Sequence, residues 1–328
     1  MATADIQELA NQVRAGDRRA LGRAITLVES SRPDDRDQAR QLLDILAPFS
    51  GDSIRIGISG APGVGKSTSI EALGNLLIDQ GHKVAVLAVD PSSALSGGSI
   101  LGDKTRMERL SQRVEAFIRP SPSGDTLGGV ARRTRETMQI VEAAGFDVVL
   151  VETVGVGQSE TEVSRMTDMF LLLLLPSGGD ELQGIKRGIV ELADLIVVNK
   201  ADGDTKAAAD RTASDYRNAL HFLHPRSSNW TVPVMSYSAL DTDRTAELWG
   251  IVSEYREVMS DSGEIQSRRA EQARAWMWSE VTDTLLDRFK ASASVKAQIQ
   301  TLEAEVTRGD IAPGAAAKKL ISAFLSDN

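Results

Sequence analysis

A glycine-rich loop at residues 60–67 holds the first side chains whose types and spacing could do chemistry. It fits the pattern G-x-x-x-x-G-K-[ST], in which glycines let the backbone curl so that successive N–H groups point at phosphate oxygens. Lys66 would reach the β- and γ-phosphates, and the Ser67 hydroxyl would bind Mg²⁺. The predicted phosphate-binding residues are Gly60, Ala61, Pro62, Gly63, Val64, Gly65, Lys66, Ser67 and Thr68.

A second motif, the run NKAD at residues 199–202, follows an apolar stretch later in the chain. A carboxylate accepts two hydrogen bonds, and guanine offers two adjacent donors, the ring N–H and the exocyclic amine. Adenine has an acceptor in place of that ring N–H, so Asp202 would select guanine. Asn199 would steady the loop and the base, and the stem of Lys200 would cover one face of the ring. This motif is weak alone, but together with the phosphate loop it predicts a site for GTP or GDP.

A shorter element, SYSAL at residues 236–240, ends the next apolar run. Its Ser238 and Ala239 match an element of P-loop GTPases whose backbone contacts the guanine oxygen. For this stretch taken alone, a plain loop is the alternative interpretation.

Three carboxylates end apolar runs or lie close to them in sequence, as the metal ligands of a phosphate site would. Glu152 ends the run VVLVE, and the amide of Gly155 could meet the γ-phosphate. Asp90 ends the run VAVLAVD, and Asp103 lies in GGSILGDKTR, where a loop or helix cap is the alternative role. Together with Ser67, these carboxylates could hold Mg²⁺ with phosphate oxygens and water.

Phosphoryl transfer at such a site needs charge neutralisation and in-line positioning more than covalent chemistry. Lys66 and a Mg²⁺ ion held by Glu152 would supply the first part. Lys186 could add a positive charge, although an exposed helical lysine is the alternative. Gln158 could position the attacking water only by analogy, because its spacing from Glu152 differs from that in signalling GTPases. The predicted catalytic residues are therefore Lys66, Glu152 and Lys186.

An α/β sheet must position these side chains, because most of them follow a predicted strand. Residues 49–258 alternate strands with helical stretches, which is typical of a P-loop NTPase with a mostly parallel central sheet flanked by helices. Residues 1–48 form a predicted N-terminal helical extension. Residues 259–328 form a predicted C-terminal helical arm, whose apolar stripes favour dimerisation over packing within the chain. The predicted strands are Ile54–Ser59, Val84–Val89, Val114–Ile118, Val148–Glu152, Met169–Leu175, Leu195–Asn199 and Val232–Tyr237.

The composition of the 328-residue chain limits the other classes of function. A net charge of −9 argues against general binding to nucleic acid or to anionic membranes. The absence of cysteine excludes disulfides and thiolate metal sites, and three histidines are too few for a metal-storage tract. The first residues lack the apolar core of a secretory signal, and no apolar run is long enough to span a membrane. We therefore expect a cytoplasmic protein.

The complete set of motifs resembles the MeaB/ArgK family of P-loop GTPases, which are associated with methylmalonyl-CoA mutase. The resemblance covers the whole chain. The matching runs are GAPGVGKST, VDPSS, GGSILGDKTRM, RPSPSGDTLGG, ETVGVGQSE, SGGDELQGIK and VVNKAD.

This resemblance implies a homodimer that hydrolyses GTP slowly alone and faster with its partner. It implies a chaperone of the adenosylcobalamin-dependent methylmalonyl-CoA mutase, which gates cofactor loading and protects the mutase from inactivation. By the same resemblance, Asp90, Asp103 and Glu152 surround the metal together with Ser67. Residues 177–186 would form a switch that relays the nucleotide state to the mutase.

Three other functions remain open from the residues themselves. A metallochaperone-type maturation GTPase for another client enzyme is one, although the few histidines and the absence of cysteine count against nickel transfer. An ATP-dependent kinase is the second, and the argument from Asp202 opposes it. A dimeric scaffold, in which bound nucleotide locks a conformation without turnover, is the third.

Overall fold

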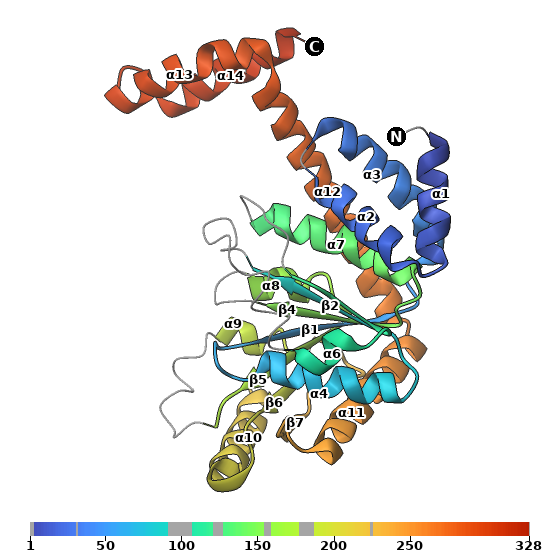
Figure 1. Ribbon diagram of the computed structural model, residues 1–328. Helices are drawn as coiled ribbons and strands as arrows, with labels where there is room; N and C mark the ends of the chain where they lie inside the picture. Colours follow the sequence, from blue (N-terminus) through green and yellow to red (C-terminus); the bar gives the residue numbers. More distant parts are fainter. Residues whose placement is uncertain are drawn as a thin grey trace. The chain divides into compact units, whose positions relative to one another are not determined.

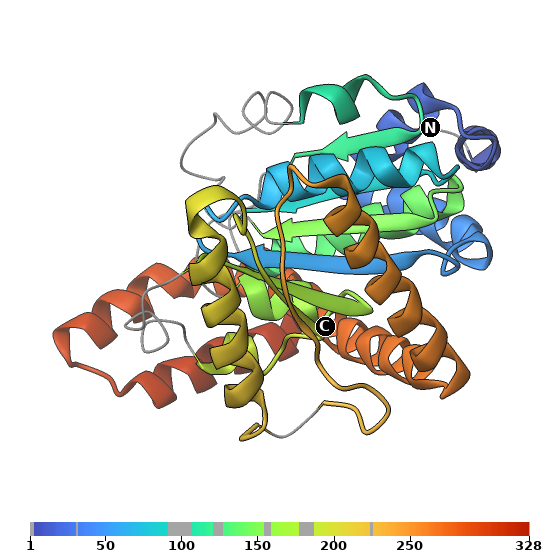
Figure 2. The same cartoon turned by 90° about the horizontal axis from the view of Figure 1, so that it is seen from below.

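The computed structural model describes residues 3–30, 32–90, 107–120, 127–153, 159–176, 187–223 and 226–327. Within these ranges seven strands form one sheet in which every pairing is parallel. Across the sheet the order is β3-β2-β4-β1-β5-β6-β7 (Figures 1 and 2). The predicted fold class is confirmed. The strands are β1 (Ile54–Gly60), β2 (Val84–Val89), β3 (Ala116–Arg119), β4 (Val148–Thr153), β5 (Met169–Leu174), β6 (Leu195–Val198) and β7 (Val234–Ser236).

The sheet is central because its strands are apolar along nearly their whole length. Every residue of β2, β4 and β5 is buried, as in parallel sheets that are covered on both faces. All seven predicted strands are present, with boundaries that shift by two residues at most. The shift at β3 has a local cause. The chain first turns, with the Ala116 N–H donating to Arg113 O at 3.3 Å, which leaves Val114 75% exposed.

Helices cover both faces of the sheet, as a doubly wound fold requires. On one face, α7 (Leu127–Ala143) and α10 (Lys206–Leu220) pack on the apolar strand residues. On the other face, the apolar strand residues are covered by α4 (Lys66–Asp79) and α11 (Thr242–Asp261) (Figures 1 and 2). The shorter helices here are η1 (Ala47–Phe49), α6 (Glu108–Gln112), α8 (Ser159–Ser164), α9 (Arg187–Val190) and η3 (Gly203–Thr205).

The N-terminal extension consists of α1 (Thr3–Arg14), α2 (Arg18–Glu29) and α3 (Pro33–Leu46). Pro33 begins α3, and the residues before it form two separate helices. The break comes at Gly16, whose φ is +77°, and at Asp17, whose carboxylate caps α2 by accepting from the N–H groups of Arg19 and Ala20. These two backbone hydrogen bonds lower the pKa of Asp17. The buried faces of the three helices join the core that α7 forms with the sheet.

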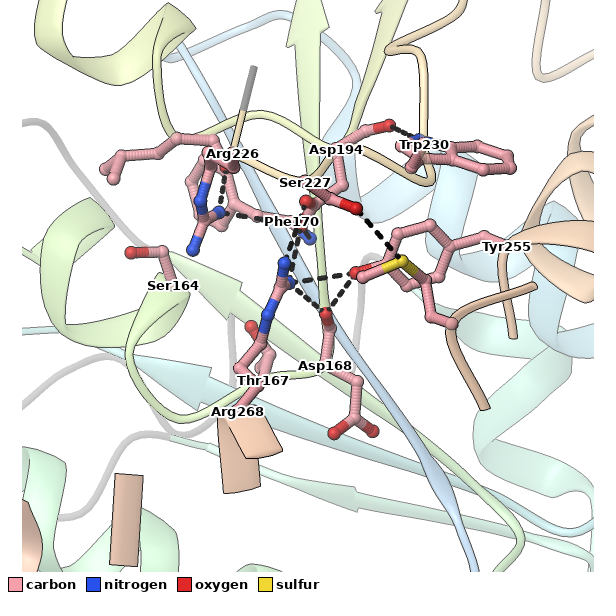
Figure 3. A network of polar contacts seen from close by, with 12 residues as sticks. Ser164, Thr167, Asp168, Phe170, Asp194, Arg226, Ser227, Trp230, Tyr255 and Arg268 are labelled. Atoms are coloured by element: carbon pink, nitrogen blue, oxygen red, sulfur yellow. Dashed lines mark hydrogen bonds and ion pairs between the residues drawn. The ribbon is translucent and has the colours of Figure 1, made fainter. Parts of the chain in front are cut away.

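A network of ion pairs lies at the amino ends of β5 and β6. The predicted site lies at the other end of the sheet, where the strands have their carboxyl ends. Asp168 directly precedes β5 and accepts hydrogen bonds from Nε and Nη2 of Arg269, both at 2.6 Å. Asp194 directly precedes β6 and accepts from Nη1 of Arg268 at 3.1 Å (Figure 3). We call this the amino-end network. Its members are Asp168, Asp194, Arg226, Tyr255, Arg268 and Arg269.

The chain divides into two compact units, Met1–Arg269 and Ala270–Asn328. The helix α12 (Glu264–Ala291) begins in the first unit, and its remainder forms the second with α13 (Ala293–Arg308) and α14 (Pro313–Asp327). Gly309, with φ +81°, ends α13, and α14 begins at Pro313. The domain boundaries expected after residues 48 and 258 remain predictions. Among the described residues, no helix combines the length and the apolarity needed to cross a membrane.

Candidate nucleotide site

The phosphate loop joins β1 to α4 at the carboxyl end of the sheet, as predicted (Figure 1). Gly63 and Gly65 have φ values of +78° and +98°, which L side chains rarely adopt. Glycine is required at position 65 for two reasons. One is its positive φ, and the other is that a Cβ there would lie 2.5 Å from Nδ2 of Asn199. Val64 between them is fully buried and anchors the loop to the core. The loop therefore has the conformation that a phosphate cradle needs.

Lys66 begins α4 and turns its side chain back toward its own loop. Nζ donates a hydrogen bond to the carbonyl oxygen of Gly60 at 2.8 Å. The residue is 8% exposed, so the ammonium group is largely desolvated and would interact strongly with an anion. This position suits contact with the terminal phosphates of a nucleotide.

The candidate metal ligands meet at the carboxyl ends of neighbouring strands. The Ser67 hydroxyl donates to Oε1 of Glu152 at 3.2 Å. Glu152 pairs in register with Ala88, so the end of β4 lies beside the end of β2, where Asp90 follows. Both carboxylates are buried, with exposed fractions of 5% for Glu152 and 6% for Asp90.

These oxygen donors fit Mg²⁺, which prefers hard oxygen ligands and usually takes only one or two carboxylates from a protein. In the part of the chain that the structure describes, no three acidic or histidine side chains form a metal cluster. Phosphate oxygens and water would complete the coordination.

The loop that would read the base is tied directly to the phosphate loop. Nδ2 of Asn199 donates to the carbonyl oxygen of Val64 at 2.7 Å, and Asn199 is 2% exposed. Its Oδ1 is buried and has no hydrogen-bond partner among the described residues. Asn199 thus fixes the distance between the phosphate end and the base end of the candidate site.

The side chain of Asp202 is held by the element predicted to contact the guanine oxygen. The Ser238 hydroxyl donates to Oδ2 of Asp202 at 2.5 Å. Next to Ser238, Tyr237 is fully buried, and its carbonyl oxygen accepts from the Ala201 N–H at 2.9 Å. Burial raises the pKa of the Tyr237 phenol, which therefore stays neutral. Its hydroxyl forms a hydrogen bond with Thr245 Oγ1 at 3.3 Å.

The structure therefore brings together the predicted phosphate, base and metal residues that it describes. Three predicted site residues, Asp103, Gly155 and Lys186, lie outside the described residues, as do Gln158 and the proposed switch at 177–186. Two contributors were missed by sequence reasoning. Ser69 lies 3.5 Å from Nδ2 of Asn199, and Thr205 contacts the guanine motif from the start of α10. Neither belongs to a motif, so matching sequence patterns does not identify them.

The chain matches the family model described as "Methylmalonyl Co-A mutase-associated GTPase MeaB" over residues 21–294. It is 58% identical to a putative GTPase of Caulobacter vibrioides, over 98% of both chains. It is 47% identical to the protein of Mus musculus called "Methylmalonic aciduria type A homolog, mitochondrial", over 95% of this chain and 77% of that one. A solved structure, titled "Crystal structure of LAO/AO transport system kinase", superposes with a TM-score of 0.76 at 38% identity, over 99% of both chains.

Proposed function

The chain belongs to the MeaB family of P-loop GTPases, and we propose that it is a chaperone of an adenosylcobalamin-dependent methylmalonyl-CoA mutase. In this proposal it gates the loading of the cofactor and protects the mutase from inactivation. The family match carries the proposal, because it spans residues 21–294 and the family description names that mutase. The name of the mouse relative, which refers to methylmalonic aciduria, supports the same link.

The chain hydrolyses GTP, and we propose specific roles for its residues in that reaction. Residues 60–68 would bind the phosphates, with Lys66 balancing the negative charge that the terminal phosphates carry. The base would lie against Lys200 and pair with Asp202. The Asn199–Val64 hydrogen bond would keep the base and the phosphates at a fixed separation.

We propose that Mg²⁺ is held by Ser67, Asp90 and Glu152, and also by Asp103. When bound, the ion would neutralise charge between the β- and γ-phosphates. Glu152 would hold the ion beside Ser67, because its Oε1 accepts a hydrogen bond from the Ser67 hydroxyl at 3.2 Å. Gly155 and Lys186 remain proposed contacts to the γ-phosphate.

The second unit supplies the proposed contact between two copies of the chain. On α12, Met277, Val281 and Leu285 recur at every fourth residue and are 53%, 40% and 54% exposed. Residues spaced in this way share one face of a helix. Trp278, Leu286, Ile321 and Leu325 are further large apolar side chains exposed in this unit. Sedimentation of the full chain tests the dimer, and a mass equal to one chain would contradict it.

The test of the proposed function is GTP turnover by the purified chain at fixed Mg²⁺, alone and with a methylmalonyl-CoA mutase and its cofactor. We expect slow turnover that rises when the mutase is added. In parallel, the half-life of mutase activity should lengthen with the chain and GTP. The Lys66→Ala variant is the control for contaminating GTPases.

If GTP turnover does not change when the mutase is added and no complex forms, the mutase is not the partner. The assignment as a GTPase would be unaffected. A maturation GTPase for another client enzyme would then be the next candidate, and a pull-down would identify the client. Preferential binding of ATP over GTP would contradict the proposed reading of the base by Asp202.

A further inference from the structure

The peptide between Lys200 and Ala201, inside the guanine motif, is held at both of its polar ends. Its N–H, on Ala201, donates to the carbonyl oxygen of Tyr237 at 2.9 Å. Its carbonyl oxygen, on Lys200, accepts a hydrogen bond from the Thr205 hydroxyl. The carbonyl oxygen of Asp202 also lies 2.8 Å from Thr205 Oγ1, but it has another donor in the Thr205 N–H at 3.1 Å. Since a hydroxyl has one proton, Lys200 O is the acceptor that depends on it.

This restraint matters because Lys200 has a backbone conformation that lysine rarely adopts. Its φ is +59°, and no other non-glycine residue in the described ranges has a positive φ. The left-handed region is unfavourable for residues with a Cβ, so other contacts must hold it. If Lys200 left this conformation, the direction of its stem relative to the Asp202 carboxylate would change.

The Thr205 hydroxyl has no part in capping the neighbouring helices. Thr205 is the N-cap residue of α10, yet its side chain makes no cap hydrogen bond. Asp202 is likewise the N-cap residue of η3 without a side-chain cap. Its carboxylate is instead turned to Ser238, which holds Oδ2 at 2.5 Å. The side chains of Asp202 and Thr205 therefore make hydrogen bonds within the base-binding loops and do not cap helices.

We propose that Thr205 is a positioning residue for guanine selection, acting through the peptide between Lys200 and Ala201. By fixing that peptide, the hydroxyl holds the carboxylate of Asp202 where both guanine donors can reach it. This inference rests on the proposed guanine site at residues 199–202. It assigns selectivity to a residue outside that motif.

The test compares GDP with inosine diphosphate, which lacks the exocyclic amine and so loses one of the two donors to Asp202. Both ligands have the same phosphates, so any general weakening cancels in the ratio of their Kd values. In Thr205→Val the preference for GDP should fall by about 3- to 10-fold, the range expected for one hydrogen bond. Thr205→Ser keeps the hydroxyl and should retain the preference.

Thr26→Val is the matched control, because its exposed hydroxyl donates to the Gly22 carbonyl at 2.9 Å in α2, away from the site. This variant should keep the wild-type ratio. If Thr205→Val weakens both ligands equally, or leaves the ratio unchanged, the positioning role is wrong. If the wild-type protein itself shows no preference for GDP over inosine diphosphate, the proposed guanine site at residues 199–202 is wrong. That result needs no variant.

Discussion

The two ends of the same sheet use polar side chains in opposite ways. At the carboxyl end, side chains of the candidate site contact groups that a ligand could replace, such as Lys66 with the Gly60 carbonyl and Ser67 with Glu152. At the amino end, Asp168 and Asp194 are surrounded by permanent partners from distant parts of the chain. The difference indicates that one end is built to exchange partners and the other to keep them.

The partners at the amino end compensate the cost of burying charge. The Asp168 carboxylate is fully buried and accepts from the Arg55 N–H at 2.8 Å as well as from Arg269. Tyr255 donates its hydroxyl to the Asp168 carbonyl oxygen at 2.7 Å, and burial raises the pKa of that phenol, so it stays neutral. Burial lowers the pKa of Arg268, but its interactions with Asp194, Tyr255 and Asp168 together outweigh burial and hold that pKa above its usual value. The Arg268 guanidinium therefore remains charged.

The largest effect should follow from removing a buried carboxylate at the amino end. Asp168→Ala leaves the Arg269 guanidinium without its partner in a desolvated place, which should lower the free energy of unfolding by about 3–5 kcal/mol. Urea denaturation measures this loss. The Kd for GDP of the folded protein should stay within about twofold of the wild type, because distant sites are nearly independent.

Asp168→Asn is the companion variant if Asp168→Ala does not fold. It keeps the shape and some hydrogen bonds, so its loss of stability should be smaller. A large change in the Kd for GDP with either variant, measured on folded protein, would mean that the two ends are coupled and that the contrast between them is wrong.

The next effect belongs to the carboxyl end and should leave stability unchanged. In Lys66→Ala the charge-assisted contacts to the terminal phosphates are lost, so affinity for GTP should fall by at least about 100-fold. Titration with a fluorescent GTP analogue measures it, and urea denaturation should give the wild-type midpoint. Lys296→Ala, at an exposed position on α13, is the control. A Lys66→Ala protein that unfolds readily would show that Lys66 is a structural residue.

The contrast also explains what the sequence could predict. The carboxyl end follows local rules, because glycine spacing, strand ends and the run NKAD are each contained in a few consecutive residues. Motif reasoning therefore located the phosphate loop and placed Asp90 and Glu152 at the ends of strands. It did not foresee the Asn199–Val64 hydrogen bond, which depends on how two loops meet in space.

No such rule was available for the amino-end network. Asp168, Asp194 and Arg268 are ordinary charged residues that lie far apart in the sequence, and each alone is typical of a solvated surface. Parallel strands bring Asp168 and Asp194 to the same end of the sheet, and α12 then supplies Arg268 and Arg269. Predicting this needs the strand order and the position of α12, neither of which periodicity gives.

A smaller effect should separate recognition of the base from binding of the phosphates. Asp202→Asn replaces an acceptor by a donor facing the exocyclic amine of guanine, so affinity for GDP should fall by about 10- to 100-fold. Xanthosine diphosphate has a carbonyl oxygen in place of that amine and should bind the variant better than GDP does. Competition against a fluorescent nucleotide measures both. Equal weakening of the two nucleotides would show that Asp202 does not face the base.

The smallest effect should come from the most exposed member of the amino-end network. The Arg226 side chain is 29% exposed, and its Nη1 lies 3.6 Å from Oδ2 of Asp194. In Arg226→Ala, Asp194 keeps Arg268 and the Phe170 N–H, so no buried charge loses its only partner. We expect a loss of about 1 kcal/mol or less in urea denaturation. If Arg226→Ala lowers the free energy of unfolding as much as Asp168→Ala does, the stability of the network depends on its total charge. It would then not depend on how buried each charge is and how many partners it has.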